Sequence, residues 1–111
     1  MSYDVSIGDV SLNYTFNMAR LFYDLIPNYD VECRGGLFAI DGLTGKEATG
    51  VLSAAFENIN HDYCALNGAS GFREKYDAPN GWGSTDGAMI FLARILAGCA
   101  LNPRKRVSVS A

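Results

Sequence analysis

The chain has 111 residues, of which 49% are hydrophobic and 19% are charged, and its net charge is −3. This length supports one domain with a single core and is too short for two domains. The apolar fraction excludes a disordered chain, and the acidic balance argues against direct nucleic-acid binding, which needs a basic face. We therefore expect a single domain over residues 1–111.

The targeting and cysteine signals favour a cytoplasmic protein. Residues 1–4 lack the basic start and the apolar run of a signal peptide, and no apolar run is long enough to cross a membrane. The three cysteines, Cys33, Cys64 and Cys99, form no CxxC pair, which argues against a zinc site and a disulfide framework. We expect neither a metal nor a cofactor.

Alternating apolar and polar residues mark one short strand at each end of the sequence. Residues 3–7 and 107–110 both show this period of two, and Gly8-Asp9 is a turn signal after the first of them. Because neither strand is stable alone, we predict that they pair in a small sheet. The alternative is a frayed C-terminal tail.

A first helix is predicted to begin near Asn13 or Thr15 and to end at Pro27. Its apolar residues recur at steps of three and four, which places them on one helix face. They are Leu12, Phe16, Ala19, Tyr23 and Ile26. Asn13 would cap this helix and leave its amide exposed at the helix start.

The middle of the chain contains one ambiguous segment and one clear helix start. Residues 28–36 are predicted to form a charged loop, and residues 37–40 to form either a helical turn or a buried strand. Thr44 and Glu47 have the spacing of a capping box, which opens a second amphipathic helix. Its pattern continues toward residue 66, before the Asn67-Gly68 stop signal.

Residues 72–76 are predicted to form a short amphipathic turn, and residues 84–101 to form an apolar central helix. Ser84 is the expected N-cap, and Arg94 is the only charge after the first turn. A helix without a polar face belongs inside a domain. We therefore predict an α+β fold in which three main helices pack around this C-terminal helix. If it instead lay at the periphery with bare apolar sides, self-association would have to replace the monomer.

The loop before the central helix is the best candidate for a ligand site. Its glycines, with Ser84 and Thr85 at a helix N-terminus, could face an anion or a carboxylate, and Trp82 could stack on a flat ligand. Asn13 and Asn17 would complete such a site. The alternative interpretation is that Trp82 packs over the core as a lid.

No catalytic or metal constellation is evident. His61 and Cys64 would share one helix side, but sequence spacing does not supply the geometry of a nucleophile pair. The basic run at residues 104–106 complements the dipole of the preceding helix. We therefore expect a protein that is not an enzyme.

Three segments together resemble small uncharacterised proteins of bacteriophages and prophages. They are Asn13-Tyr14-Thr15-Phe16-Asn17, residues 36–45 (GLFAIDGLTG), and Tyr76-Asp77-Ala78-Pro79 with Gly83. These match an N-x-T-Y-N start, a G-x-x-x-L-x-G-x-T-G middle and a Y-x-x-P-x-x-G approach to the last helix, although Phe16 replaces a tyrosine. The resemblance implies a phage or mobile-element origin and no catalytic residue. It also implies work typical of small phage proteins, such as disabling a host machine, including CRISPR-type defence.

The resulting expectation is a phage-type protein-binding module that contacts a host protein or complex. The residues expected to bind the partner come from two polar, aromatic loops and are Tyr29, Asp30, Glu32, Asn80 and Trp82. The alternative is a domain that binds a small ligand or an anion at the start of the central helix.

Overall fold

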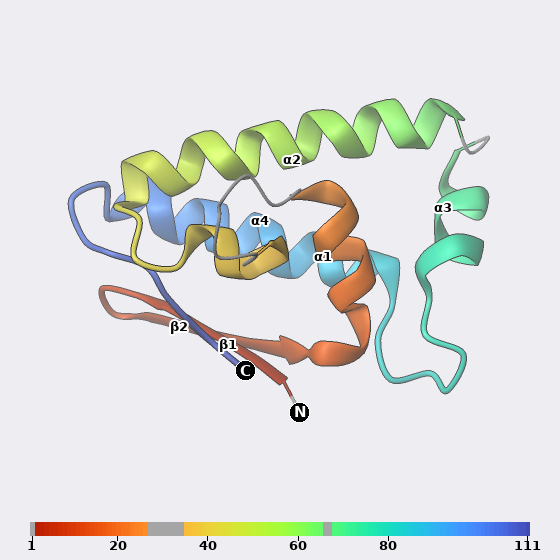
Figure 1. Cartoon of the computed structure of the whole chain (residues 1–111), viewed down its shortest axis with the longest axis horizontal. Coiled ribbons are helices and arrows are strands. Elements are labelled where there is room, and N and C mark those ends of the chain that lie inside the picture. Colours follow the sequence, from red (N-terminus) through yellow and green to blue (C-terminus); the bar gives the residue numbers. More distant parts are fainter. Residues whose placement is uncertain (1, 27–34, 66–67) are drawn as a thin grey trace.

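The computed structural model describes residues 2–26, 35–65 and 68–111, and it has the predicted α+β architecture (Figure 1). The elements, in chain order, are β1 (Ser2–Ile7), β2 (Val10–Thr15), η1 (Phe16–Met18), α1 (Ala19–Leu25), η2 (Gly36–Ile40), α2 (Gly45–Ala65), α3 (Ala69–Tyr76), α4 (Thr85–Leu101) and β3 (Ser108–Ser110). η1 and η2 are 3-10 helices. No helix in these described ranges combines the length and the apolarity that a membrane span requires.

The sheet has three antiparallel strands in the order β2-β1-β3. The predicted pairing of the two terminal strands is confirmed, since Val5 lies opposite Val109 in the register of β1 and β3. The predicted turn is confirmed as well. Gly8 adopts a φ of 57°, which a glycine adopts without strain, and the two-residue turn joins β1 to β2 as a hairpin.

The predicted start of the first helix at Asn13 is wrong, because residues 10–15 form β2. Leu12 fits the helical stripe, but Leu12 and Tyr14 also alternate with polar residues, and pairing with β1 decides in favour of a strand. Asn13 donates across the hairpin to Asp4 Oδ1 at 2.9 Å instead of capping a helix. The helical segment begins after Thr15, whose hydroxyl accepts the backbone N–H of Asn17.

The ambiguous segment after residue 35 is helical, and the predicted capping box is present. η2 buries Leu37 and Ile40. The Thr44 hydroxyl accepts the backbone N–H of Glu47 at 3.2 Å, and Glu47 Oε1 accepts the backbone N–H of Thr44 at 3.1 Å. The Glu47 carboxylate accepts hydrogen bonds from both the N–H and the hydroxyl of Thr44, and these lower the pKa of the carboxyl. The α2 helix extends from this box to Ala65.

The helix α4 lies between α2 and the sheet (Figure 1). It also contacts α3, and Phe22 of α1 reaches it through Phe91, with ring centroids 6.1 Å apart. Ser84 caps the helix as predicted, because its hydroxyl accepts the backbone N–H of Gly87. Cys99 is fully buried, in agreement with the expected core position.

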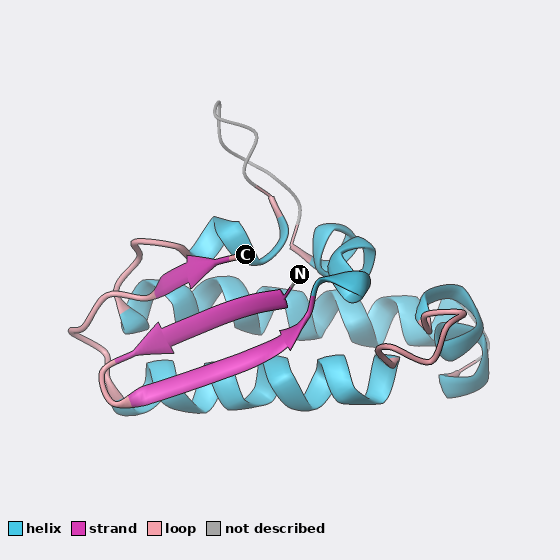
Figure 2. Cartoon of the chain, turned by 90° about the horizontal axis from the view of Figure 1, so that it is seen from below, coloured by secondary structure: helices cyan, strands magenta, loops and turns pink. Residues whose placement is uncertain are grey.

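The structure packs α2, α3 and the sheet against α4 but leaves one side of the helix exposed. Ile90 is 55% exposed and Leu101 is 79% exposed. The view from below shows why, because α4 runs along one edge of the molecule next to β2, and nothing drawn there covers its outer side (Figure 2). The apolar residues of α4 therefore divide into a buried face and a bare one.

Two buried hydroxyls, those of Tyr3 and Thr85, have no hydrogen-bond partner among the described residues. Tyr3 of β1 is fully buried, and its ring packs against Phe16, Phe22 and Phe38 at centroid distances of 4.8, 5.5 and 5.8 Å. Burial raises the pKa of Tyr3 to about 12. A buried hydroxyl without a partner lowers stability.

We predict that Tyr3→Phe stabilises the fold by about 1 kcal/mol, because it removes a desolvated polar group and keeps the ring packing. Thermal unfolding should show a melting temperature higher by ~5 °C. The matched control is Tyr76→Phe, which should lower the melting temperature, because the Tyr76 hydroxyl donates to Asp24 Oδ2 at 2.8 Å. A less stable Tyr3→Phe protein would contradict the assignment.

Candidate functional site

The segment between α3 and α4, residues 77–84, forms an ordered loop around the only tryptophan. We call it the Trp82 loop. Asn17 of η1 donates its side-chain amide to the Trp82 carbonyl at 3.1 Å. Within the loop, the Trp82 N–H donates to Asn80 Oδ1 at 3.0 Å, and the Gly81 N–H donates to the Ala78 carbonyl at 3.1 Å. The backbone on both sides of the indole is therefore held by hydrogen bonds.

The end of this loop is tied to the sheet through a single hydroxyl. Tyr14 of β2 accepts the backbone N–H of Ser84 at 3.0 Å and donates to the Ser84 carbonyl at 3.0 Å. Its ring packs on Phe91 at a centroid distance of 5.4 Å. Asp77 Oδ1 accepts the backbone N–H of Thr85 at 2.7 Å, which closes the other side of the loop onto the start of α4.

The Trp82 side chain points into solvent, with 72% of its surface exposed. The lid over the core that we considered as an alternative is therefore wrong. The next residue, Gly83, has a φ of 132°, and a Cβ there would come within 2.8 Å of Thr15 and 2.9 Å of Met18, so the loop backbone lies close to both residues.

Two hollows flank the Trp82 loop. The first, of about 440 Å³, is lined by Asn13, Tyr14, Thr15, Gly81, Trp82, Gly83, Ser84 and Gly87. It brings together three of the predicted ligand-binding residues, namely Asn13, Trp82 and Ser84. The other two are placed elsewhere, because Thr85 is buried and Asn17 lines the second hollow, of about 400 Å³, with Arg20, Lys75 and Asn80.

The predicted partner-binding residues can be followed only in part. Asn80 and Trp82 share the Trp82 loop, and both are exposed. Tyr29, Asp30 and Glu32 lie outside the described residues.

Comparison with known proteins gives no match. No family model, no curated protein and no solved structure is significantly similar to the chain. The site must therefore be interpreted from its own geometry.

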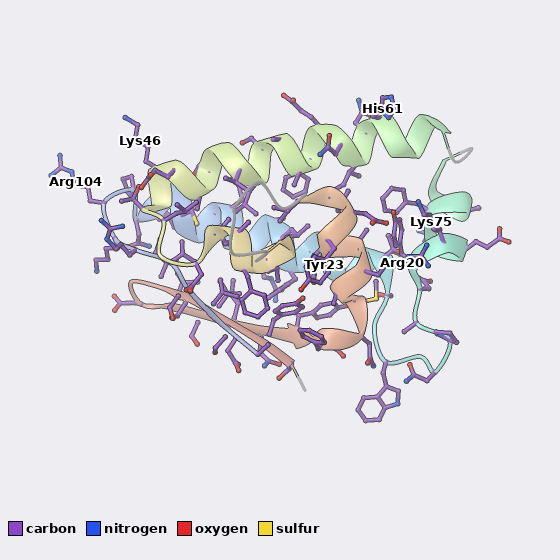
Figure 3. All side chains as sticks on the ribbon, in the orientation of Figure 1. Arg20, Tyr23, Lys46, His61, Lys75 and Arg104 are labelled. Atoms are coloured by element: carbon purple, nitrogen blue, oxygen red, sulfur yellow. The ribbon has the colours of Figure 1, made fainter. Side chains whose placement is uncertain are left out.

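The other chemistry-bearing residues of the sequence do not converge on the Trp82 loop. His61 projects from the outer side of α2, away from the body of the molecule (Figure 3), and the side chain of Cys64 lies outside the described part of the chain. Lys46 and Arg104 project at the opposite end of the molecule from Lys75 (Figure 3). In the described ranges no group of three His, Cys, Asp or Glu residues is placed to hold a metal ion.

Sequence reasoning missed Tyr14 as a residue that organises the site. A strand assignment for residues 10–15 would have placed its side chain on the inner face with Leu12. Which backbone group its hydroxyl meets, 70 residues later in the chain, cannot be inferred from that pattern.

The hydrogen bond to Asp77 makes the Trp82 loop sensitive to acid. The Thr85 backbone N–H, and to a smaller extent Arg73, lower the pKa of the Asp77 carboxyl below its ordinary 3.8. A lowered pKa in the folded state means that the stabilisation is present above pH 3.8 and is lost as the pH falls through the folded-state pKa.

We therefore predict that Asp77→Asn costs only ~0.3 kcal/mol at neutral pH, because the amide oxygen still accepts the Thr85 N–H and only the charge is lost, and that the difference from the wild type shrinks as the pH falls below 3.8. Urea unfolding at pH 7, 5, 4 and 3 measures this difference. Asp9→Asn, in the exposed hairpin turn, is the control and should show no such trend. A constant difference at every pH would rule out an ionised Asp77 as the stabilising group.

Proposed function

We propose that the protein is a non-enzymatic protein-binding module and that the Trp82 loop is its contact surface. The observation that carries the proposal is an indole that is 72% exposed on a loop whose backbone is hydrogen-bonded on both sides. Tryptophan is among the residues that contribute most binding energy at protein interfaces. Because the loop is already ordered, a partner would lose little affinity to fixing its backbone.

The surroundings of the loop support an interface with another protein. An exposed aromatic residue between two hollows can enter a pocket of a partner while partner side chains fill the hollows. On the side of the second hollow, Arg20 and Lys75 add long basic side chains from α1 and α3 (Figure 3). An apolar centre with a polar border is the usual arrangement of such interfaces.

For the partner, we propose a host protein or protein complex. This part of the proposal rests on the resemblance to phage proteins, and it includes the possibility of an inhibitor of a host defence complex, comparable to anti-CRISPR proteins.

The first hollow supports a second candidate function, the binding of a small flat ligand. It combines the Trp82 ring with the polar side chains of Asn13 and Ser84. An anion fits it less well, because the Ser84 hydroxyl already accepts the Gly87 N–H and the carboxylate of Asp86 lies in the same helical turn. A neutral ligand with a planar ring is therefore the better alternative.

We predict that Trp82→Ala weakens binding to the partner at least ~30-fold, the effect of losing a hot-spot residue worth about 2 kcal/mol. The partner would be isolated from host lysate with the tagged full-length chain, and its affinity for wild type and variants measured by titration calorimetry. Tyr23→Ala removes another exposed ring, on α1, and is the matched control with unchanged affinity.

Wild-type affinity of the Trp82→Ala variant, or no specific partner at micromolar concentration, would refute the protein-binding proposal. The ligand alternative has its own measurement. Because Trp82 is the only tryptophan, its fluorescence reports directly on ring-containing compounds that occupy the first hollow. A saturable shift in the absence of any protein partner would favour that alternative.

A further inference from the structure

Along one edge of the molecule lie a strand without a neighbour on its outer side and a helix face that no other described element covers. The strand β2 is the outer strand of the sheet, and α4 runs next to it with its bare face turned outward (Figure 2). We propose that this edge binds a second copy of the chain through a two-fold axis, with β2 against β2 and α4 against α4. The proposal does not depend on the function assigned to the Trp82 loop.

The strand β2 lacks the features that protect edge strands from pairing. Its sequence, VSLNYT, contains no charged residue and no proline. Ile7 and Val10 flank the two-residue turn and form a hydrogen-bonded pair. In an antiparallel ladder only every second residue hydrogen-bonds to the neighbouring strand, so the residues in between direct their backbone groups away from β1. Ser11, Asn13 and Thr15 therefore present backbone N–H and C=O groups to a further strand. The opposite edge strand, β3, has only three residues.

The bare face of α4 has the spacing of a helix that packs against another helix. Its exposed residues recur at steps of three and four along the whole helix. They are Asp86, Ile90, Ala93, Arg94, Ala97, Ala100 and Leu101. The alanines allow close approach of a second helix, and Ile90 and Leu101 supply apolar area. This face combines two large exposed apolar side chains with alanines and two charges, a composition that suits contact with another protein surface.

The two surfaces have a common centre. A hollow of about 340 Å³ between them is lined by Ser11, Leu12, Asn13 and Tyr14 of β2 and by Gly87, Ile90, Phe91 and Arg94 of α4. Asn13, in the second half of β2, is therefore level with Ile90. An antiparallel pairing of Asn13 with Asn13 of the second copy, with Ser11 opposite Thr15, uses the outward backbone groups of β2. The same axis sets Ile90 level with Ile90 of the second copy, and partner side chains fill the hollow.

The charges on α4 are complementary about this centre. Asp86 and Arg94 lie four residues on either side of Ile90. In an antiparallel pair centred on Ile90, Asp86 of each copy is level with Arg94 of the other. Arg94 has no ion-pair or hydrogen-bond partner in the described part of the chain. Asp86 is oriented by Arg73 at 3.1 Å, and its carboxylate keeps further acceptor sites for a second guanidinium.

The size of the edge suits a specific but modest dimer. The 17-residue helix α4 is about 25 Å long, and a helix layer and a strand layer together are roughly 20 Å high. The surface area that each copy can bury in the interface is therefore about 500 Å². The total of about 1,000 Å² is at the lower limit for a specific interface. The pairing would give a continuous six-stranded sheet above two antiparallel α4 helices.

Sedimentation equilibrium of the full chain and its variants tests this arrangement. The wild type should dimerise with micromolar affinity. Asp86→Arg and Arg94→Asp should each be weakened at least ~30-fold, because each places two like-charge contacts in the interface. An equimolar mixture of these two variants should form a heterodimer, because both contacts then have opposite charges. Only an antiparallel pairing of Asp86 with Arg94 makes this prediction.

Two further measurements separate loss of the interface from loss of the fold. Circular dichroism melts should show that both charge variants are folded, although Asp86→Arg also loses the contact with Arg73. Ser11→Pro removes an outward N–H of β2 and leaves the pairing with β1 intact, so it should give a folded monomer. Tyr23→Ala, on α1 and outside the interface, should remain a dimer.

A wild-type chain that stays monomeric at about 100 μM, well above a micromolar dissociation constant, would overturn the proposal. Charge variants that dimerise like the wild type would do so too. So would a mixture of the two charge variants that remains monomeric.

Discussion

The Tyr14 hydroxyl is the contact on which the arrangement of the functional surfaces depends. It binds both the N–H and the carbonyl of Ser84, so it attaches the last residue before α4 to the edge strand of the sheet. Gly87 must lack a side chain for this contact, because a Cβ there would overlap the Tyr14 oxygen. Both the direction of α4 under the sheet and the position of the Trp82 loop follow from this junction.

The second constraint is how α4 is covered. In the described part of the chain, α2, α3 and the sheet pack on α4, and its outer side stays exposed. The proposed dimer would bury this remaining face and the free edge of β2 in one interface. Because its axis passes near Ile90, in the first half of α4, the dimer would bring the C-terminal end of one copy's α4 toward the Trp82 loop of the other.

Local signals predicted a large part of the fold correctly. The alternation at the two ends indicated strands that pair, Thr44 and Glu47 indicated the start of α2, and Ser84 indicated the start of α4. Each of these depends on residues close together in the sequence or on a period that only one kind of element shows. Residues 10–15 lack such an unambiguous period, because Leu12 fits both a helical stripe and a strand. Only pairing with β1 decided between the two. The structure does not bring all five residues of the predicted ligand site together, since Thr85 is buried and Asn17 lines the second hollow.

The sequence by itself determined the class of the fold, the limits of α2 and α4 and the presence of a glycine-flanked tryptophan before α4. The tertiary structure alone decided which way that tryptophan points and which side of α4 is bare. The physical reason is that an all-apolar helix has no polar stripe to mark its outer face, so its orientation is set by the elements that happen to pack on it. In the same way, the position of the Trp82 loop involves the close approach of Gly83 to Thr15 and Met18, which are far away in the chain.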